Sequence, residues 1–281
     1  MSTSSAHREA EALLDALPQL MREHPAVAAL RDSSAIVLHG STTIGVEDGR
    51  ADWDVWVLTD TDTAAQFGRD AGTRFIEFKS RRPGHFTVEP LEQFQRRMSA
   101  CDFELISELR YAQLLSDCGG MGASLLAEAR KPMSDAVRNA WFRFHYVEMR
   151  SEHRACDNAI ERCEPIPLLL GITRTLQHAL QAGMVLSREP YRYSKWLARL
   201  AATTAHGRDI VPLVEQTVRL IEQGALREPG PEVAHPINLK LRQIRQVLVD
   251  SARESGIDGR WLSHWYLHID EARGGIHDVT W

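Results

Sequence analysis

Two aspartates separated by a single residue are the part of this chain whose spacing most directly suggests chemistry. Asp52 and Asp54 flank Trp53 at the start of an apolar run that continues to Leu58. If this run forms a β-strand, side chains two positions apart point to the same face, so the two carboxylates converge. Carboxylate oxygens are the ligands that Mg²⁺ prefers. We therefore predict that Asp52 and Asp54 bind a divalent metal ion.

A Gly-Ser pair precedes these aspartates. Gly40 and Ser41 follow the short apolar run of residues 36–39, and ten residues separate Ser41 from Asp52. Glycine allows a tight turn and a close approach of the backbone to a ligand, and Ser41 adds a hydroxyl beside exposed backbone N–H groups. The segment could thus bind phosphate oxygens without a Walker-type lysine. In the simpler alternative, Gly40 and Ser41 only end one strand and the aspartates only solvate the start of another.

Together the two segments resemble the signature of the nucleotidyltransferase superfamily, which includes DNA polymerase β and the aminoglycoside and lincosamide nucleotidyltransferases. That signature is Gly-Ser or Gly-Gly followed by Asp-x-Asp, and it is matched by Gly40, Ser41, Asp52 and Asp54. The resemblance implies a nucleoside triphosphate such as ATP as co-substrate and a pair of Mg²⁺ ions as cofactors. It also implies that a nucleoside monophosphate is transferred to an acceptor and that pyrophosphate leaves.

Enzymes of this superfamily usually hold a third carboxylate on a neighbouring strand. Residues 74–79 and 85–89 are two extended segments on either side of a Pro-Gly turn signal, and apolar residues alternate with polar ones along both. This pattern predicts a β-hairpin with one core face and one polar face. Glu77 and Glu89 both belong to the polar face and are the candidates for the third metal ligand or the general base.

The expected register of the hairpin leaves the choice between the two glutamates open. A turn centred near Arg82 would place Glu77 almost opposite Thr87. We favour Glu89 over Glu77 for the catalytic and metal-binding role. Either glutamate could instead be a solvent-facing residue on an edge hairpin.

The remaining patterns of the first half predict the elements that position these residues. Residues 4–16 have helical spacing, and Pro18 and Pro25 then divide the lead-in into shorter helical pieces. After the hairpin we expect a helix over 91–98, an edge strand over 111–115 and a helix over 123–129. We predict an α/β (α+β) fold in which residues 1–132 form a small mixed nucleotidyltransferase sheet with flanking helices.

The second half lacks the period-two alternation of strands. Helical periodicity predicts helices over 136–163, 166–186, 193–204, 210–223 and 239–254. We therefore predict that residues 133–281 form an α-helical substrate-binding domain.

Three weaker signals lie in this half. Residues 190–197 resemble a segment of small-molecule nucleotidyltransferases in which a lysine meets the triphosphate, and Lys195 is one of only four lysines in the chain. Lys195 could equally be a surface residue lying over an aromatic contact. His145 to His153 predict a solvated helix face with one satisfied histidine. The aromatic residues 261–268 predict helix packing rather than an acceptor pocket.

Composition limits the class of protein. A net charge of -5 argues against a dedicated nucleic-acid binder and fits a cationic or neutral small partner. No stretch approaches the roughly 20 apolar residues that span a bilayer, so we expect no membrane association and a cytoplasmic protein. The four cysteines include no CxxC pair, so we expect reduced, mostly buried thiols and no zinc site. The apolar helical half would permit a homodimer.

We therefore predict a metal-dependent nucleotidyltransferase that transfers AMP from ATP, or another nucleoside monophosphate, to a hydroxyl of a small molecule. The resemblance suggests an antibiotic as acceptor and a role in antibiotic resistance. Two alternatives remain open. The acceptor could be a protein or a biosynthetic intermediate. The chain could also be a nucleotide-binding or antitoxin-like module that keeps the fold without turnover.

Overall fold

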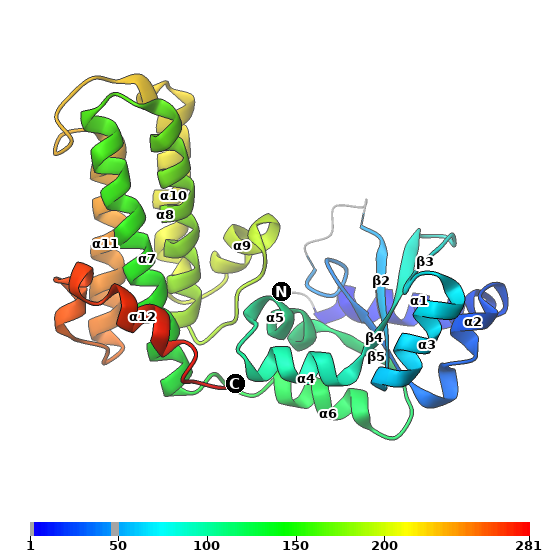
Figure 1. The fold of residues 1–281 in the computed structure, drawn as a ribbon. Coiled ribbons are helices and arrows are strands. Elements are labelled where there is room, and N and C mark those ends of the chain that lie inside the picture. The colour runs from blue at the N-terminus through cyan, green and yellow to red at the C-terminus, as the bar shows by residue number, and fades with distance from the viewer. Residues whose placement is uncertain (1–2, 46–50) are drawn as a thin grey trace. The chain divides into compact units, whose positions relative to one another are not determined.

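The computed structural model describes residues 3–45 and 51–281 of the chain. The chain divides into two compact units, Met1–Lys131 and Pro132–Trp281 (Figure 1). The first contains a mixed sheet with flanking helices, and the regular elements of the second are all helical. The predicted α/β (α+β) fold class, a small mixed sheet followed by a helical region, is confirmed.

The sheet of the first unit has five strands in the order β3-β4-β2-β1-β5. They are β1 (Ala35–His39), β2 (Trp53–Thr59), β3 (Phe75–Phe78), β4 (Gly84–Pro90) and β5 (Gln113–Asp117). β2 and β4 run parallel, whereas the other neighbouring strands pair antiparallel, which makes the sheet mixed. β1 and β2 lie inside the sheet and are almost wholly buried, in keeping with their largely apolar sequences. β5 is the predicted edge strand.

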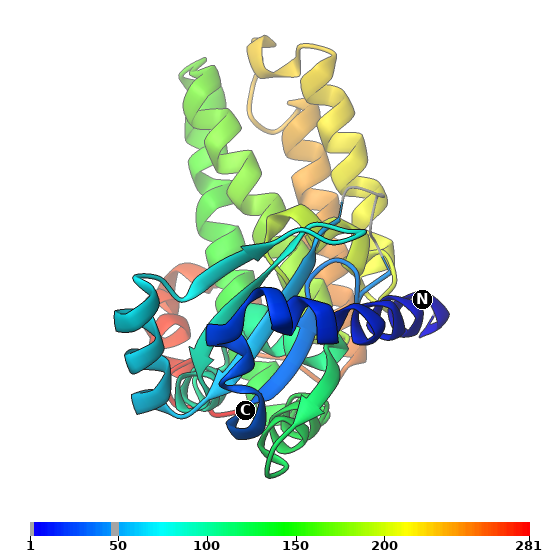
Figure 2. The ribbon, with the colours of Figure 1, turned by 90° about the vertical axis from the view of Figure 1, so that its right-hand side faces the viewer.

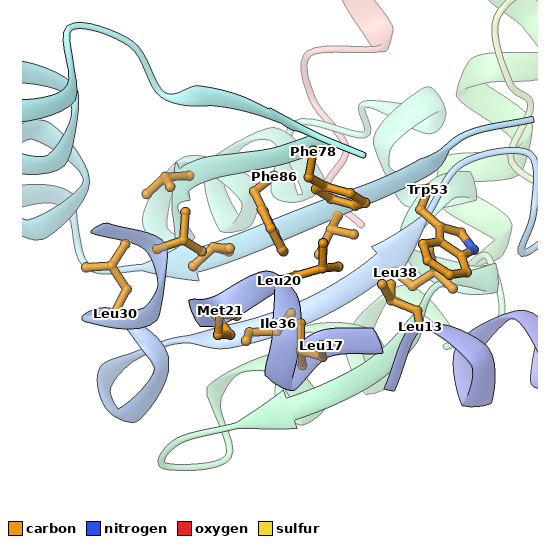
Figure 3. Packing of buried hydrophobic residues seen from close by; sticks show 14 of the residues in the cluster. Leu13, Leu17, Leu20, Met21, Leu30, Ile36, Leu38, Trp53, Phe78 and Phe86 are labelled. Atoms are coloured by element: carbon orange, nitrogen blue, oxygen red, sulfur yellow. The ribbon is translucent and has the colours of Figure 1, made fainter. Parts of the chain in front are cut away.

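Helices cover this sheet. They are α1 (Thr3–Glu23), α2 (Pro25–Ala28), the 3₁₀ turn η1 (Arg31–Ser33), α3 (Thr61–Ala71), α4 (Leu91–Ser99), α5 (Phe103–Tyr111) and α6 (Met121–Ala129). α1 crosses one face of the sheet (Figure 2). Its apolar side chains join those of the strands in one buried cluster (Figure 3), which includes Leu13, Leu17, Leu20, Ile36, Leu38, Trp53, Val55, Val57 and Phe86. Because alternate residues of β2 supply this core, the residues between them face away from it.

α1 is longer than predicted, because it continues through Pro18. Proline removes the backbone hydrogen bond to the carbonyl of Leu14. Leu14 lies on the exposed side of the helix, where water can bind that carbonyl. Leu17 and Leu20, on either side of Pro18, are both buried in the core cluster, and this burial keeps the helix continuous. Pro25 does begin a new helix, α2.

Helices α3 and α5 have no counterpart among the predicted elements. α3 buries only Ala64 and Phe67, so its apolar periodicity is weak. The sequence nevertheless contains typical capping residues at both ends of α3. Asp60 accepts a hydrogen bond from the backbone N–H of Thr63 at 2.9 Å, and Gly72 closes the helix with φ +70°. α3 belongs to the crossover that lets β4 return parallel to β2.

The second unit contains the five helices that the periodicity predicted. Its elements are α7 (Asp135–Glu161), α8 (Pro165–Leu186), α9 (Ser194–Ala201), α10 (Gly207–Glu222), η2 (Ala225–Arg227), α11 (Pro236–Glu254), η3 (Arg260–Leu262), η4 (Trp265–Leu267) and α12 (Ile269–Gly275). The four long helices α7, α8, α10 and α11 run side by side in both views (Figures 1 and 2). α7 and α8 come close at Gly171, where an added Cβ would lie 2.8 Å from Sγ of Cys156.

The middle of α7 is not the solvated face that its sequence predicted. His145 and His153 are both buried. Nδ1 of His145 lies 3.0 Å from Nδ1 of His178 on α8, and Nε2 of His153 lies 2.5 Å from Oδ1 of Asn238 on α11. Partners from neighbouring helices therefore satisfy these rings inside the bundle. Periodicity along one helix cannot reveal such partners.

Two of the four cysteines and part of the C-terminal aromatic segment are buried. The four cysteines are free, but only Cys101 and Cys156 are buried, fewer than predicted. Trp261 is buried and meets the ring of Tyr146 edge to face with centroids 5.6 Å apart, which is the packing role expected for residues 261–268. Tyr266 of the same segment is exposed and departs from that expectation. No helix within residues 3–45 and 51–281 combines the length and apolarity needed to cross a bilayer.

Candidate metal and phosphate site

Four neighbouring strands place polar side chains in one row across the sheet. His39 of β1 pairs with Asp54 of β2. Asp54 also pairs with His85 of β4, which pairs in turn with Glu77 of β3. Directly paired residues point to the same face of a sheet. This face is opposite the one covered by α1, because both neighbours of Asp54 in the chain belong to the core beneath α1.

Asp52, Asp54 and His85 form a group that could hold a metal ion. Each side chain offers one ligand atom, and these atoms all lie within 4.8 Å of one another. Nδ1 of His85 lies 3.5 Å from Oδ1 of Asp54. Asp52 is exposed and the other two are partly buried, so solvent reaches the group. A divalent cation fits this donor set, because the adjacent carboxylates repel each other and provide hard oxygen ligands beside an imidazole nitrogen.

The surroundings of His85 keep its ring neutral and in place. Burial lowers the pKa of His85 below its ordinary value, and the charges of Asp52 and Glu77 act in the opposite direction. The ring of His85 stacks on Phe75, with centroids 4.3 Å apart. At neutral pH a neutral imidazole offers an unprotonated nitrogen, which can bind a metal ion or accept a proton.

Gly40 is required by the position of Asp54. Its backbone has φ +84°, and a Cβ at this position would lie 2.1 Å from Oδ2 of Asp54. Any other residue would therefore displace the carboxylate as well as strain the turn. The hydroxyl of Thr43 donates to the carbonyl of Gly40 at 2.9 Å and stabilises the turn. Ser41 follows within it and is partly buried, whereas residues 46–50 of the predicted loop lie outside the described residues.

Aromatic and acidic side chains pack beside this row of polar residues, next to His39. The ring of His39 stacks on Trp56, with centroids 3.5 Å apart. Nδ1 of His39 lies 3.6 Å from Oε2 of Glu108 on α5. Trp56 in turn meets Phe94 of α4 edge to face at 4.8 Å. Helices α4 and α5 therefore support the sheet on the same face as Asp54.

The Asp-Trp-Asp segment is anchored from the opposite face. The indole N–H of Trp53 donates to Oε2 of Glu9 on α1 at 2.9 Å. Arg82 donates to the other oxygen of Glu9 at 3.2 Å and to the carbonyl of Ala51 at 2.6 Å. These bonds fix the backbone on both sides of Asp52. Glu9 and Arg82 carry no recognisable signal in the sequence, because only the fold brings them to this segment.

The two glutamates proposed as the third carboxylate lie in different places. Glu77 lies opposite His85 instead of Thr87, because the hairpin turn is centred on Arg81 rather than Arg82. Glu89 lies four residues beyond His85, about 13 Å further along the strand. There it forms an ion pair with Arg74 at 3.1 Å. The structure thus groups His85, and neither glutamate, with the two aspartates.

Lys195 belongs to the second unit. It is exposed in the first turn of α9, and its Nζ lies 4.7 Å from the ring centroid of Trp196. This is the position of a surface lysine over an aromatic contact. Binding of a triphosphate by Lys195 stays a prediction.

Comparison with solved structures supports the fold. A nucleotidyltransferase-like protein from Exiguobacterium sibiricum matches with a TM-score of 0.50 and 12% sequence identity, over 87% of this chain and 77% of that one. No protein-family model and no curated protein sequence matches the chain. The likeness is one of fold, a nucleotidyltransferase-like arrangement of a mixed sheet and a helical region.

Proposed function

We propose that this chain is a metal-dependent nucleotidyltransferase, which moves a nucleoside monophosphate from a nucleoside triphosphate to a hydroxyl of an acceptor. The supporting observation is the contact between the Gly40 turn and Asp54, beside Asp52 and His85. A tight turn next to paired carboxylates can bring phosphate oxygens and a cation to one place. The nucleotidyltransferase-like fold agrees with this chemistry.

Each residue has a distinct part in the proposed reaction. Asp52, Asp54 and His85 would hold the divalent metal, which would neutralise charge on the triphosphate and on the entering and leaving oxygens. The turn at Gly40 and Ser41 would bind terminal phosphate oxygens through backbone N–H groups and the serine hydroxyl. The acceptor oxygen forms a bond to the α-phosphorus, whose bond to the β-phosphate oxygen breaks. Pyrophosphate leaves with that electron pair, and the hydroxyl proton passes to a base.

His85 takes the part that a third carboxylate was predicted to play. It is the third donor of the group, and its neutral ring could either bind the metal or accept the proton. Glu77, the next residue of the row, is the carboxylate we propose as the alternative base. Glu89 shares their polar face but lies outside the group, which makes it a matched control position.

The finer assignments rest on charge and on the resemblance of the motif. We propose ATP as the donor and a small hydroxylated molecule as the acceptor, an aminoglycoside or lincosamide being the first to test. Two exposed or partly exposed carboxylates would attract a cationic acceptor. The mixed oxygen and nitrogen donors make Mn²⁺ a cofactor to test beside Mg²⁺.

The test is pyrophosphate release from each ribonucleoside triphosphate with Mg²⁺ or Mn²⁺, across a panel of small-molecule and protein acceptors. We expect Asp54→Asn to lower the rate by about 10²- to 10³-fold, because a charge that stabilises the transition state is lost. Glu89→Gln should retain the wild-type rate. Equal loss in both variants, or release that persists without a divalent metal, would contradict the proposal.

A nucleotide-binding module without turnover is the second candidate. It is favoured by one observation, the absence of a third carboxylate from the group among the described residues. Such a module would be stabilised further against heat by a triphosphate when Mn²⁺ is added, and Asp54→Asn would abolish this Mn²⁺-dependent part of the stabilisation. Binding of this kind without pyrophosphate release from any acceptor mixture would favour the module over the enzyme.

A further inference from the structure

The helical unit contains a pocket rich in arginine. The pocket has a volume of about 530 Å³ and lies between α7, α11 and η4. We call it the arginine pocket and define it by Arg150, Arg154, Arg242, Arg245, Trp265 and Tyr266. The positions on α7 are four apart and those on α11 are three apart, so each helix presents its pair on one face. The volume is in the range of small-molecule sites.

The positive charge of this pocket is only partly balanced. Arg154 lies 3.5 Å from Asp157 and 3.8 Å from Glu232, and Arg242 lies 4.0 Å from Glu232. These separations are longer than those of good charge-assisted hydrogen bonds. Within residues 3–45 and 51–281, no carboxylate forms an ion pair with Arg150 or Arg245. The pocket therefore has an excess of guanidinium groups.

Arg150 is held in place but keeps an unused donor. Its guanidinium carbon lies 5.7 Å from the ring centroid of Trp265. Its Nε is buried and has no hydrogen-bond partner among the described residues. A buried donor without a partner costs free energy that a ligand could recover.

The neighbouring guanidinium groups also oppose each other. Burial, followed by the charge of Arg150, lowers the pKa of Arg245 below its ordinary value. Arg242 acts in the same direction, whereas Tyr146 and Asp157 oppose the change. An anion bound between these guanidinium groups would attract each of them and so offset their mutual repulsion.

The carboxylate of Asp157, which also lines the pocket, is shared between the helical bundle and the arginines. Asn238 is fully buried and donates to Oδ1 of Asp157 at 2.7 Å and to the carbonyl of Glu232 at 2.8 Å. The carbonyl oxygen of Asn238 faces His153. Oδ1 of Asp157 thereby belongs to a network within the bundle, and Oδ2 faces Arg154, so this single carboxylate balances only part of the charge of the four arginines.

We propose that the arginine pocket binds a small phosphorylated ligand that carries at least two anionic phosphate groups and a flat ring. Guanidinium groups form paired hydrogen bonds with phosphate oxygens, and Trp265 and Tyr266 offer aromatic surface for the ring. A nucleic-acid strand needs an extended basic surface, whereas these arginines line one pocket of about 530 Å³. This site is separate from the proposed metal site and does not depend on the proposed function.

The test is isothermal titration of the full chain with inorganic pyrophosphate, ADP, citrate and a twelve-nucleotide single strand, in EDTA to exclude metal-dependent binding. We expect saturable binding of ADP, weaker binding of pyrophosphate and weaker binding still of citrate. Arg245→Gln and Arg242→Gln should each weaken ADP binding at least fivefold. Trp265→Ala should weaken ADP binding more than pyrophosphate binding.

Two controls separate this site from general charge and from the metal site. Arg253→Gln removes the same charge from α11 at an exposed position outside the pocket, and it should change the affinity less than twofold. Asp54→Asn should leave binding in EDTA unchanged. Circular dichroism checks folding, and the exposed Arg154→Gln replaces any variant that unfolds. No saturable binding of ADP or pyrophosphate, equal loss with Arg253→Gln, loss with Asp54→Asn, or tighter binding of the single strand would each overturn the proposal.

Discussion

The two units build sites of opposite charge by different means. In the first unit, strand pairing and one tight turn bring Asp52, Asp54 and His85 together, and the two aspartates lie two positions apart in the sequence. In the second unit, side chains from α7, α11 and η4 form the arginine pocket. A net charge of -5 therefore hides an uneven distribution. The acidity that suggests a cationic partner belongs to the first site, whereas the helical unit offers an anion site.

One methyl group at Gly40 should damage the first site and leave the arginine pocket intact. Gly40→Ala forces a side chain into a left-handed conformation and into Oδ2 of Asp54. We expect a loss of about 2–4 kcal/mol in the free energy of unfolding, from backbone strain and overpacking. We also expect metal-dependent thermal stabilisation to disappear. Urea denaturation and thermal melting with and without Mn²⁺ measure these effects.

Gly45→Ala is the matched control for this variant. Gly45 has φ +65°, but no atom of the described residues lies within 4 Å of an added Cβ. Gly45→Ala should therefore lower the free energy of unfolding only by the cost of the backbone strain, about 1–2 kcal/mol, and should keep the metal-dependent thermal stabilisation. Equal effects of the two substitutions would mean that the turn does not position Asp54.

In the second unit the vulnerable feature is a pair of histidines, the buried His145 and the partly buried His178, rather than a turn. Burial, followed by the charge of His178, lowers the pKa of His145 well below its ordinary value. Burial likewise lowers the pKa of His178, with Glu148 opposing and Arg174 reinforcing that change. The Nδ1 atoms of the pair face each other, so one must lack a proton. Both rings are therefore neutral in the folded protein at neutral pH.

This arrangement predicts how stability depends on pH. Below the unfolded pKa of about 6.5 the unfolded chain takes up protons that the folded chain excludes. Stability is therefore complete above pH 6.5 and declines as the pH falls below it. His145→Gln should cost about 1–3 kcal/mol at pH 8 through a disrupted buried hydrogen bond, and it should flatten the decline between pH 8 and pH 5. Urea denaturation across this range measures both quantities.

The exposed His264 provides the control for the histidine pair. His264→Gln should leave both the stability at pH 8 and its decline toward pH 5 close to those of the wild type. A decline that His145→Gln leaves unchanged would show that the acid sensitivity arises elsewhere in the chain.

A site can be predicted from the sequence to the extent that its residues lie close together along the chain. Gly40, Ser41, Asp52 and Asp54 could be recognised because turn residues and period-two spacing act over a few positions. His85 was on the predicted polar face, but its position beside Asp54 depends on the parallel pairing of β2 and β4. That pairing requires the crossover through α3, a helix with too few apolar residues to be recognised.

The remaining differences have the same origin. A hairpin turn centred one residue earlier moved Glu77 from opposite Thr87 to opposite His85, because every pairing follows from the turn. Nothing in the helical periodicity of the second unit marks its arginines. Only the packing of α7 against α11 shows that Arg150 and Arg245 share one pocket.

The smallest expected effect concerns the distant support of the first site. Glu9 accepts from Trp53 and from Arg82, and its side chain is only 17% exposed. Glu9→Gln keeps an acceptor but loses the charge opposite Arg82, so we expect a cost of about 1 kcal/mol in the free energy of unfolding. Because Arg82 also binds the carbonyl of Ala51, metal affinity should fall a fewfold. Urea denaturation and titration with Mn²⁺ measure the two effects. Glu11→Gln, at an exposed position of the same helix, should change neither. If Glu9→Gln matches Glu11→Gln in both measurements, the Asp-Trp-Asp segment holds its geometry through strand pairing alone.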